Sequence, residues 1–211
     1  MIPVMIVPIL NTPDLLYKML ASIDYPVTKL IIIDNGDCLN TDSGWPVEHV
    51  QSTKVIKMPS NLGVAGSWNL GIKAAPFAPW WLVVNFDVEW PAGSLEKFDK
   101  EAETDSVILA DGWQPWSAFA LGEGVVTKVG LFDEAYYPAY FEDNDYEDRC
   151  LASGVRVERS DIQIAHRNSS TLQVGDLSER NLVTFPANQA YYSERNHSGW
   201  SLERRRRLTW D

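Results

Sequence analysis

The sequence contains little cysteine and has no excess of basic charge, and both shortages restrict its function. Its two cysteines, Cys38 and Cys150, lie far apart and form no CxxC pair, so neither a structural zinc site nor a disulfide framework is indicated. The 18 Lys and Arg residues are outnumbered by 29 Asp and Glu residues, which gives a net charge of -11. An acidic surface repels phosphate backbones, and general nucleic-acid binding is therefore disfavoured.

Long apolar runs are also missing. The N-terminus lacks a charged region followed by a long apolar stretch, which argues against a signal peptide. The most apolar segment, residues 74–86, is interrupted by Pro76 and Pro79 and is too short to span a bilayer. We therefore expect no transmembrane segment, at most peripheral membrane contact, and a reducing, cytoplasmic location.

The first half of the chain alternates strand-like and helix-like patterns. The 211 residues are 45% hydrophobic and 22% charged, as expected for a single globular domain. We predict strands at residues 4–7, 30–33, 54–57 and 81–86, and helices that begin at Thr12-Pro13 and that cover residues 64–75 and 95–102. Continuous apolar strands between helices indicate an α/β fold with a mostly parallel central sheet flanked by helices.

The second half is less regular. It predicts short strands at residues 106–110, 116–121, 155–157 and 162–164, and a helix over residues 144–153. Beyond Leu172 the pattern weakens. We predict one domain over residues 1–172, followed by a C-terminal tail over residues 173–211 that packs on the domain or joins an acceptor site.

Two acidic residues stand at the ends of predicted buried strands. Asp34 follows residues 30–33, and Asp87 follows residues 81–86. Ligands of parallel α/β sheets bind beyond the carboxyl ends of the strands, so these two residues are candidates for one shared site. Asp87 would suit a hard divalent cation whose remaining ligands come from a bound diphosphate. The alternative is that Asp87 only caps the turn after its strand.

An acidic run follows two aromatic residues in the second half. It comprises Glu142, Asp143, Asp145, Glu147 and Asp148. Like charges at this density repel one another unless a cation or a function compensates. An EF-hand is excluded, because Asp148 and Gly154 stand where its glycine and closing glutamate would be. The alternative is a solvated helix N-terminus, where acidic side chains suit the helix dipole.

Three further features have both a functional and a structural interpretation. His166 follows two predicted strands and is either a metal ligand near the carboxylates or a structural histidine. The segment Asn61–Gly66 resembles a phosphate-binding glycine loop at a helix start, but it is neither GxGxxG nor a P-loop and could be a tight turn. Trp113 and Trp116 flank Gln114-Pro115 and either contact sugar rings or fill the core.

The order of these motifs resembles the large inverting family of GT-A glycosyltransferases that includes bacterial rhamnosyl- and galactofuranosyltransferases. The resemblance covers roughly residues 3–170. It rests on Val7–Asn11, Ile33–Gly36, Asn61–Gly71, Val84–Asp87, Val129–Glu134 and Tyr140–Asp145, followed by Gly154 and His166. The segments Asn61–Gly71 and Gly130–Asp145 are specific in combination. The sequence departs from the family pattern at Asn85, which replaces the first acid of the metal-binding DxD motif.

The resemblance implies a role for each matching residue. Donor binding would fall to Pro8, Asn11, Asp34, Asn35, Asn61, Gly63, Asn69, Asn85 and Asp87. Asp87 and His166 would hold Mn²⁺ or Mg²⁺ on the diphosphate. Asp143 would be the general base, and Glu142 would position hydroxyl groups of the acceptor or donor. Trp113, Trp116 and Asp145 are the candidates for contacts with the acceptor.

We therefore predict an inverting, metal-dependent transfer of a sugar from a nucleoside diphosphate, UDP- or dTDP-linked, to a hydroxyl group. The acceptor, a glycan, protein, lipid carrier or nucleic acid, is left open, as is the oligomeric state. One alternative is a GT-A-like protein that binds a nucleotide-sugar without catalysis. Another is a nucleotidyltransferase, which is disfavoured because Val7–Asn11 lacks the glycine-rich loop and lysine of that class. The basic run Arg204–Arg207 would either dock an acidic acceptor or be a solvated helix end.

Overall fold

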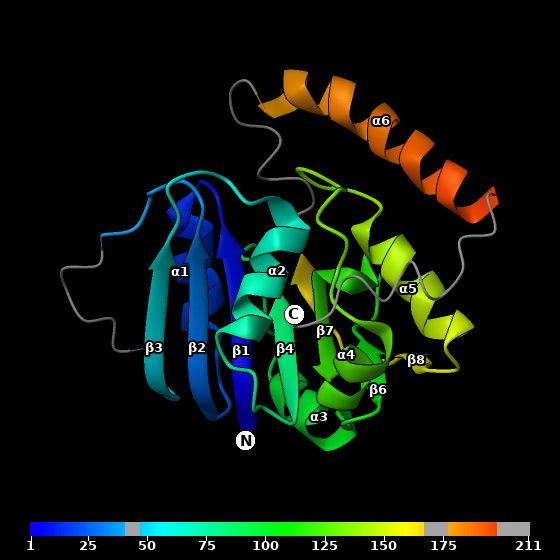
Figure 1. Ribbon diagram of the computed structural model, residues 1–211. Coiled ribbons are helices and arrows are strands. Elements are labelled where there is room, and N and C mark those ends of the chain that lie inside the picture. The colour runs from blue at the N-terminus through cyan, green and yellow to red at the C-terminus, as the bar shows by residue number, and fades with distance from the viewer. Residues whose placement is uncertain (41–46, 167–176, 198–211) are drawn as a thin grey trace.

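A computed structural model describes residues 1–40, 47–166 and 177–197 (Figure 1). Its centre is a seven-stranded sheet in the order β3-β2-β1-β4-β7-β6-β8. The strands are β1 (Ile2–Ile9), β2 (Val27–Asp34), β3 (Val50–Lys57), β4 (Trp80–Val84), β6 (Ser106–Leu109), β7 (Ala118–Gly122) and β8 (Arg156–Arg159). Only β7 runs antiparallel to its neighbours, β4 and β6, so the sheet is mostly parallel, as the sequence predicts.

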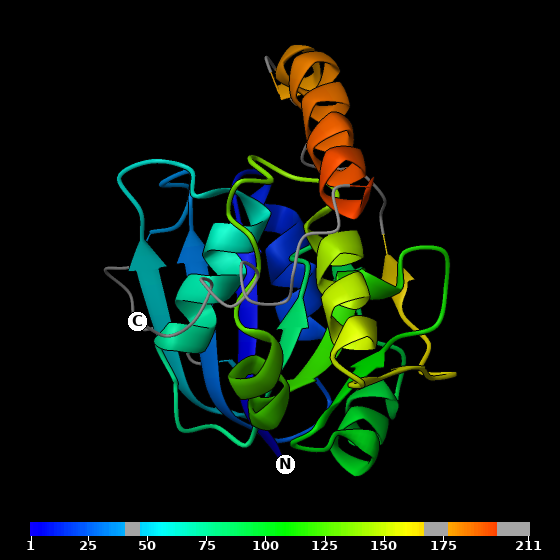
Figure 2. The same ribbon diagram turned by 45° about the vertical axis from the view of Figure 1, so that its right-hand side comes forward.

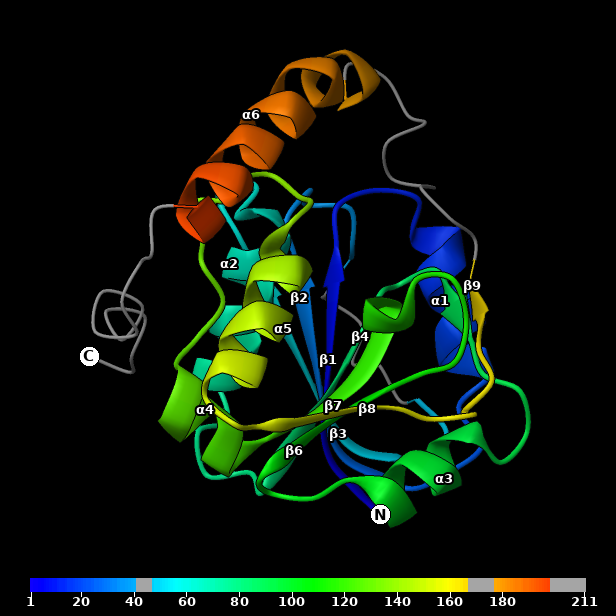
Figure 3. The ribbon, with the colours of Figure 1, turned by 90° about the vertical axis from the view of Figure 1, so that its right-hand side faces the viewer.

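Helices cover both faces of this sheet (Figure 3). On one face lie α1 (Pro13–Ala21) and α3 (Ser94–Glu101), with Leu16 and Phe98 in the core. On the other face lie α2 (Gly63–Lys73), α4 (Glu123–Val129) and α5 (Glu142–Ala152), with Trp68 and Tyr146 in the core. Each fully buried large apolar side chain contributes about 1.5–3 kcal/mol to stability. The inner strands β1, β2, β4, β6 and β7 are mostly buried on both faces, which explains their continuous apolar runs, whereas the edge strands β3 and β8 are largely exposed.

The backbone of α2 lies very close to β1. A Cβ atom built on Gly71 would lie 2.3 Å from Cγ2 of Ile6, far inside van der Waals contact. A glycine is therefore needed at this position of the Asn61–Gly71 segment for packing between helix and strand. This contact fixes the C-terminal half of α2 closely against the middle of β1.

Most predicted elements of the first half are confirmed, with boundaries that differ by a few residues. The predicted cap of α1 is wrong: Thr12 adopts φ 55° and its hydroxyl donates to the Asn11 side chain instead of capping the helix. No strand forms at residues 162–164; instead β9 (Ala165–His166) pairs with β5 (Val88–Glu89) in a separate two-stranded sheet. A 3₁₀ turn, η1 (Pro115–Ser117), precedes β7.

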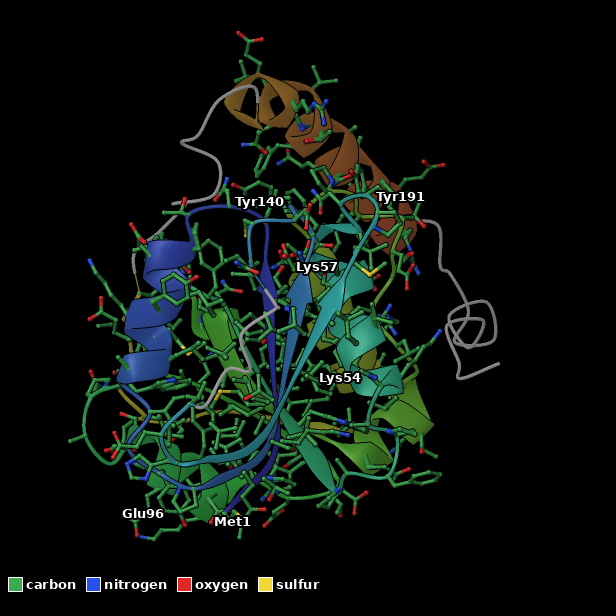
Figure 4. All side chains as sticks on the ribbon, turned by 90° about the vertical axis from the view of Figure 1, so that its left-hand side faces the viewer. Met1, Lys54, Lys57, Glu96, Tyr140 and Tyr191 are labelled. Carbon is green, nitrogen blue, oxygen red and sulfur yellow. The ribbon has the colours of Figure 1, made fainter. Side chains whose placement is uncertain are left out.

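A long C-terminal helix, α6 (Leu177–His197), lies across the carboxyl end of the sheet (Figures 1 and 2). The carboxyl end of β3, marked by Lys57, lies at the α6 end of the molecule, whereas Met1 lies at the opposite end (Figure 4). The sequence does not indicate a helix over residues 177–197, because Pro186 lies inside this range and the apolar residues follow no clear helical stripe. Arg204–Arg207 lie outside the described residues.

No helix among the described residues is both long and apolar enough to cross a bilayer. The cytoplasmic location stays a prediction.

Candidate active site

A cavity of about 620 Å³ opens at the carboxyl ends of β1 and β4. It gathers residues from both halves of the chain, as the position of strand ends in a parallel sheet predicts. The predicted site residues that border it are Pro8, Asn35, Asn61, Gly63, Asn85, Asp87, Trp113, Trp116, Glu142, Asp143 and His166. Asn11, Asp34, Asn69 and Asp145 do not border it.

Asp87 and His166 meet at the edge of this cavity. The backbone of β5 pairs with that of β9 in a register that sets Val88 opposite His166. As a result, Nε2 of His166 lies 3.1 Å from Oδ1 of Asp87. Ser117 Oγ lies 3.2 Å from the other ring nitrogen, Nδ1, and so helps to fix the orientation of the imidazole. The two predicted metal ligands, 79 residues apart, are thus brought together.

Asp34 has a structural position. Its side chain is fully buried, and its two carboxylate oxygens accept hydrogen bonds from the backbone amides of Gly36, Cys38 and Leu39. These bonds hold the turn that follows β2 and leave Asp34 off the cavity. The adjacent residue, Asn35, borders the cavity and connects the end of β2 to the Asn61–Gly71 segment. Its Nδ2 donates to Ser67 Oγ, and its Oδ1 accepts from the Leu62 amide at 3.0 Å.

The Asn61–Gly71 segment shapes one wall. Oδ1 of Asn61 accepts a hydrogen bond from the Gly63 amide at 2.9 Å, and Gly63 itself has φ +74°. A Cβ atom at Gly63 would lie 2.8 Å from the carbonyl oxygen of Pro138. Both the conformation and the close approach therefore require glycine.

Asn69 connects the two specific segments of the sequence from within the core. Its side-chain amide accepts from the Phe132 amide and donates to the Phe132 carbonyl, each at 2.9 Å. Its Nδ2 also lies 2.9 Å from Oε1 of Glu134. These bonds join the segments Asn61–Gly71 and Gly130–Asp145, and Asn69 in this way supports the wall made by the first segment without bordering the cavity.

Glu142 and Asp143 are the first two residues of α5 and border the same cavity. Glu142 is buried, and its Oε2 has no hydrogen-bond partner among the described residues. Burial, followed by the charge of Asp143, raises the pKa of Glu142 well above its ordinary value. Burial also raises the pKa of Asp143, opposed by a hydrogen bond that its Oδ1 accepts from the Asn144 amide at 2.8 Å. Both carboxyls border the cavity with a raised proton affinity, which is unlike a solvated helix end.

Asp145 differs from its two neighbours. It is buried, and its carboxylate lies 2.8 Å from Nε of Arg149 and 3.5 Å from Nη1 of Arg195 on α6. The predicted acceptor contact therefore finds no support in its position, since the side chain points into an ion-paired cluster away from the cavity lining. The acidic run is in this way divided between the site and the core.

The two tryptophans also separate. Trp116 is packed edge-to-face on Phe119, and its indole nitrogen donates to Oε2 of Glu147 at 3.0 Å. It is a core residue with one edge on the cavity. Trp113 is 91% exposed and borders the same cavity, which leaves its apolar ring face available to a ligand.

Sequence reasoning missed several cavity residues. Arg159, from the end of β8, pairs with Glu147 at 3.2 Å beside Trp116. Phe185, from α6, borders the cavity and packs against the rings of Tyr140 and Phe141. No motif marks these positions. Phe185 reaches the cavity because α6 packs over it, and this packing leaves no periodic pattern in the sequence.

Known glycosyltransferases resemble this chain in sequence. The family model described as glycosyl transferase family 2 matches residues 4–128. A galactofuranosyl glycosyltransferase of Leishmania donovani is 24% identical over a 271-residue alignment that covers 90% of this chain. The chain spans 62% of the length of that relative.

Solved structures share the fold at low identity. A mannosyltransferase from Pyrobaculum calidifontis, solved in complex with GDP-Man and Mn²⁺, superposes with a TM-score of 0.59 and 12% identity over 94% of this chain and 76% of the other. TarS of S. aureus superposes with a TM-score of 0.62 and 13% identity over 99% of this chain and 42% of the other. A shorter TarS structure, in complex with UDP-GlcNAc, gives 0.58 and 15% over 87% and 65%.

The sheet topology and these superpositions identify the GT-A fold. The chain belongs to glycosyl transferase family 2, whose model matches more than half of its length.

The Asp87–His166 pair suits a divalent cation that is shared with a nucleotide. A carboxylate oxygen and an imidazole nitrogen are both ligands that Mn²⁺ accepts, and they lie close enough to face one ion. Within residues 1–40, 47–166 and 177–197, no group of three or more His, Cys, Asp and Glu side chains could hold a metal. A cation at this pair would therefore take its remaining ligands from a diphosphate or from water.

Proposed function

We propose that this chain transfers a sugar from a nucleoside diphosphate to an acceptor hydroxyl, with inversion at the anomeric carbon. The observation that carries the proposal is one cavity that holds both the Asp87–His166 pair and the two carboxyls of raised pKa, Glu142 and Asp143. Membership of glycosyl transferase family 2 supports it.

The donor occupies the wall made by Asn35, Asn61 and Gly63. Asn85 borders the same cavity two residues before Asp87, where the diphosphate would lie. Asp87 and His166 would hold Mn²⁺ or Mg²⁺, which when bound supplies positive charge to the leaving diphosphate. The related structures contain UDP-GlcNAc or GDP-Man with Mn²⁺, so the donor assay includes UDP-, dTDP- and GDP-linked sugars.

Asp143 acts as the general base in a single displacement. It removes the proton of the acceptor hydroxyl while the hydroxyl oxygen bonds to the anomeric carbon and the bond from that carbon to the diphosphate oxygen breaks. A carboxylate whose pKa is raised by burial is better matched to this proton transfer than an ordinary one. Glu142 orients a hydroxyl group of donor or acceptor through Oε2, which lacks a partner among the described residues.

The acceptor occupies the wall made by Trp113, Trp116 and Phe185. The acidic residues that border the cavity are Asp87, Glu142, Asp143 and Glu147, with Arg159 as a cation, and this balance disfavours a phosphorylated acceptor or nucleic acid. The exposed indole of Trp113 offers an apolar face to the C–H groups of a sugar ring. A neutral glycan is therefore the acceptor that the site favours over a protein, a lipid carrier or a nucleic acid.

A donor panel tests the proposal. Thermal unfolding is followed with UDP-, dTDP- and GDP-sugars in the presence of Mn²⁺ or Mg²⁺, because a true donor stabilises the folded state by mass action. The stabilising donor is then assayed for transfer and for hydrolysis, with and without chelator. Donor binding without either reaction would instead make the chain a nucleotide-sugar-binding protein, and pyrophosphate release from a nucleoside triphosphate would make it a nucleotidyltransferase. Full activity in chelator would refute the metal role.

A further inference from the structure

Residues 137–141 connect the two walls of the proposed site. On the donor side, the Val64 amide donates to the carbonyl oxygen of Pro138 at 2.8 Å, beside Gly63. On the other side, the Phe141 carbonyl accepts from the Asp145 amide at 3.0 Å and begins the helix that carries Glu142 and Asp143. The position of residues 137–141 therefore sets the distance between the donor wall and the two carboxyls.

The backbone of this segment adopts an unfavourable conformation directly before the carboxyls. Tyr140 has φ 78° and Phe141 has φ 73°, and both carry side chains that rarely adopt left-handed backbone. Two such residues in succession persist only where the surrounding structure holds them in place. The support has to come from outside the segment.

Helix α6 supplies that support. Asn188, which is only 6% exposed, directs its Nδ2 at three carbonyl oxygens of the segment: Ala139 at 2.8 Å, Tyr137 at 3.4 Å and Tyr140 at 3.5 Å. One turn earlier, the ring of Phe185 lies 5.1 and 5.2 Å from the rings of Tyr140 and Phe141.

The C-terminal half of α6 is fixed to the same region. Tyr192 stacks on Phe141 at 5.5 Å, and its hydroxyl donates to Asp148 on α5 at 2.7 Å. Arg195, buried, pairs with Asp133 and lies 3.5 Å from Asp145. By contrast, Leu182 and Val183 of α6 are exposed, so the helix is attached through this one face.

We propose that Asn188 is a positioning residue for the transfer reaction: its amide holds the carbonyls of residues 137–140 and thereby keeps Glu142 and Asp143 in place where donor and acceptor meet. This inference rests on the proposed function. The family model ends at residue 128, so α6 lies outside the part of the chain that the model matches.

The test removes the amide in two ways. Asn188→Ala deletes the group, and Asn188→Asp keeps its shape but replaces the donor NH₂ with an acceptor that faces carbonyl oxygens. Because a misplacement of about 1 Å can cost about 100-fold in rate, we expect kcat to fall by about 10- to 100-fold in both variants. The Kd for the donor should stay within about twofold of the wild-type value.

Gln189→Ala is the matched control. Gln189 is the exposed carboxamide next in the same helix, and the same replacement there should leave kcat unchanged. Alanine favours helix more than either amide does, so a loss confined to Asn188→Ala cannot come from weakened helix propensity. If Asn188 only stabilised the fold, its replacement would lower the folded fraction and leave the kcat per folded molecule unchanged.

Two readouts complete the test. The acidic limb of the kcat–pH profile should move to lower pH in Asn188→Ala, because a loosened segment exposes Asp143, whose pKa is raised by burial and, to a smaller extent, by the charge of Glu147. Hydrogen exchange at the amides of Val64 and Asp145 should quicken in Asn188→Ala but not in Gln189→Ala. Hydrogen exchange can be measured on a protein without activity. An inactive wild-type protein would therefore refute the proposed function, while the exchange rates would still test whether Asn188 holds residues 137–141 in place. Equal exchange rates, or equal kcat, in Asn188→Ala and Gln189→Ala would overturn the inference.

Discussion

The imidazole of His166 lies 3.1 Å from the carboxylate of Asp87, although 79 residues separate them. Two strands of two residues each, β5 and β9, create this contact by pairing beyond the main sheet. In the proposed function, the pair would offer one nitrogen and one oxygen ligand to a cation on the diphosphate of the donor.

Replacing either member of the pair should raise the concentration of Mn²⁺ that half-maximal transfer requires. For His166→Ala and Asp87→Asn we expect an increase of about 10-fold or more, because each removes one of two protein ligands. A titration of activity with Mn²⁺ measures it. His49→Ala is the control, since His49 is exposed and does not border the cavity. Unchanged Mn²⁺ dependence in both variants would show that the cation, if used, is held elsewhere.

Glu142 should make the protein less stable as the pH rises. Its pKa is raised by burial, so the folded state binds the proton more tightly than the unfolded chain does. This contribution to stability is fully present below the unfolded pKa of about 4.3 and is lost as the pH rises through the folded pKa.

Glu142→Gln removes the ionisation and should therefore have a higher Tm than the wild type at pH 8, with the difference vanishing near pH 4. Thermal unfolding across this range measures the effect. Glu194→Gln, at an exposed position of α6, should show no such trend. A Tm difference that is independent of pH would mean that the carboxyl is not a buried, titrating group.

Gly63→Ala should weaken donor binding by about 10-fold or more. The added Cβ would lie 2.8 Å from the Pro138 carbonyl oxygen, which is too close for an unstrained contact. The left-handed backbone at φ +74° would cost about a further 1–2 kcal/mol. Gly93→Ala separates the two effects, because Gly93 has φ +83° but no atom within 4 Å of the added Cβ. It should lose about 1 kcal/mol of stability and keep its donor affinity. Equal donor Kd values for the two variants would contradict the role of the Gly63 wall.

Arg195→Met should destabilise the protein by about 3 kcal/mol. Removing one partner of a buried ion pair costs about 3–5 kcal/mol, and Asp133 keeps hydrogen bonds from Tyr191 and Ala135 that limit the loss. Chemical denaturation provides the measurement. Arg180→Met, at an exposed position of the same helix, should change stability by less than about 0.5 kcal/mol. Similar values for both would mean that α6 contributes little to the folded state.

The fold was largely predictable because buried parallel strands carry continuous apolar runs. Residues 30–33 and 81–86 mark β2 and β4 for this reason, and the residues that follow these two strands, Asn35 and Asn85, border the cavity. The position of individual side chains was less predictable. Asp34 and Asn35 are adjacent, and only the path of the turn decides that Asn35 borders the cavity while Asp34 binds backbone amides.

The part contributed by α6 could not be predicted. Among the described residues of α6, the buried ones are Asn188 and Arg195, and both are polar. No apolar stripe in the sequence therefore indicates which face of the helix packs on the domain. Likewise, the sequence of the acidic run does not show that Asp145 pairs with Arg149 and Arg195 while Asp143 borders the cavity. Such assignments depend on contacts between distant segments.

The central claim is that Asp143 accepts the proton of the acceptor hydroxyl, and the single-turnover transfer rate of Asp143→Asn tests it most directly. With donor and Mn²⁺ saturating, we expect the rate to fall by about 100-fold or more, the usual contribution of a general base, while the donor Kd stays unchanged. Asp14→Asn, an exposed aspartate on α1, is the matched control and should transfer at the wild-type rate. Transfer by Asp143→Asn at the wild-type rate would contradict the account.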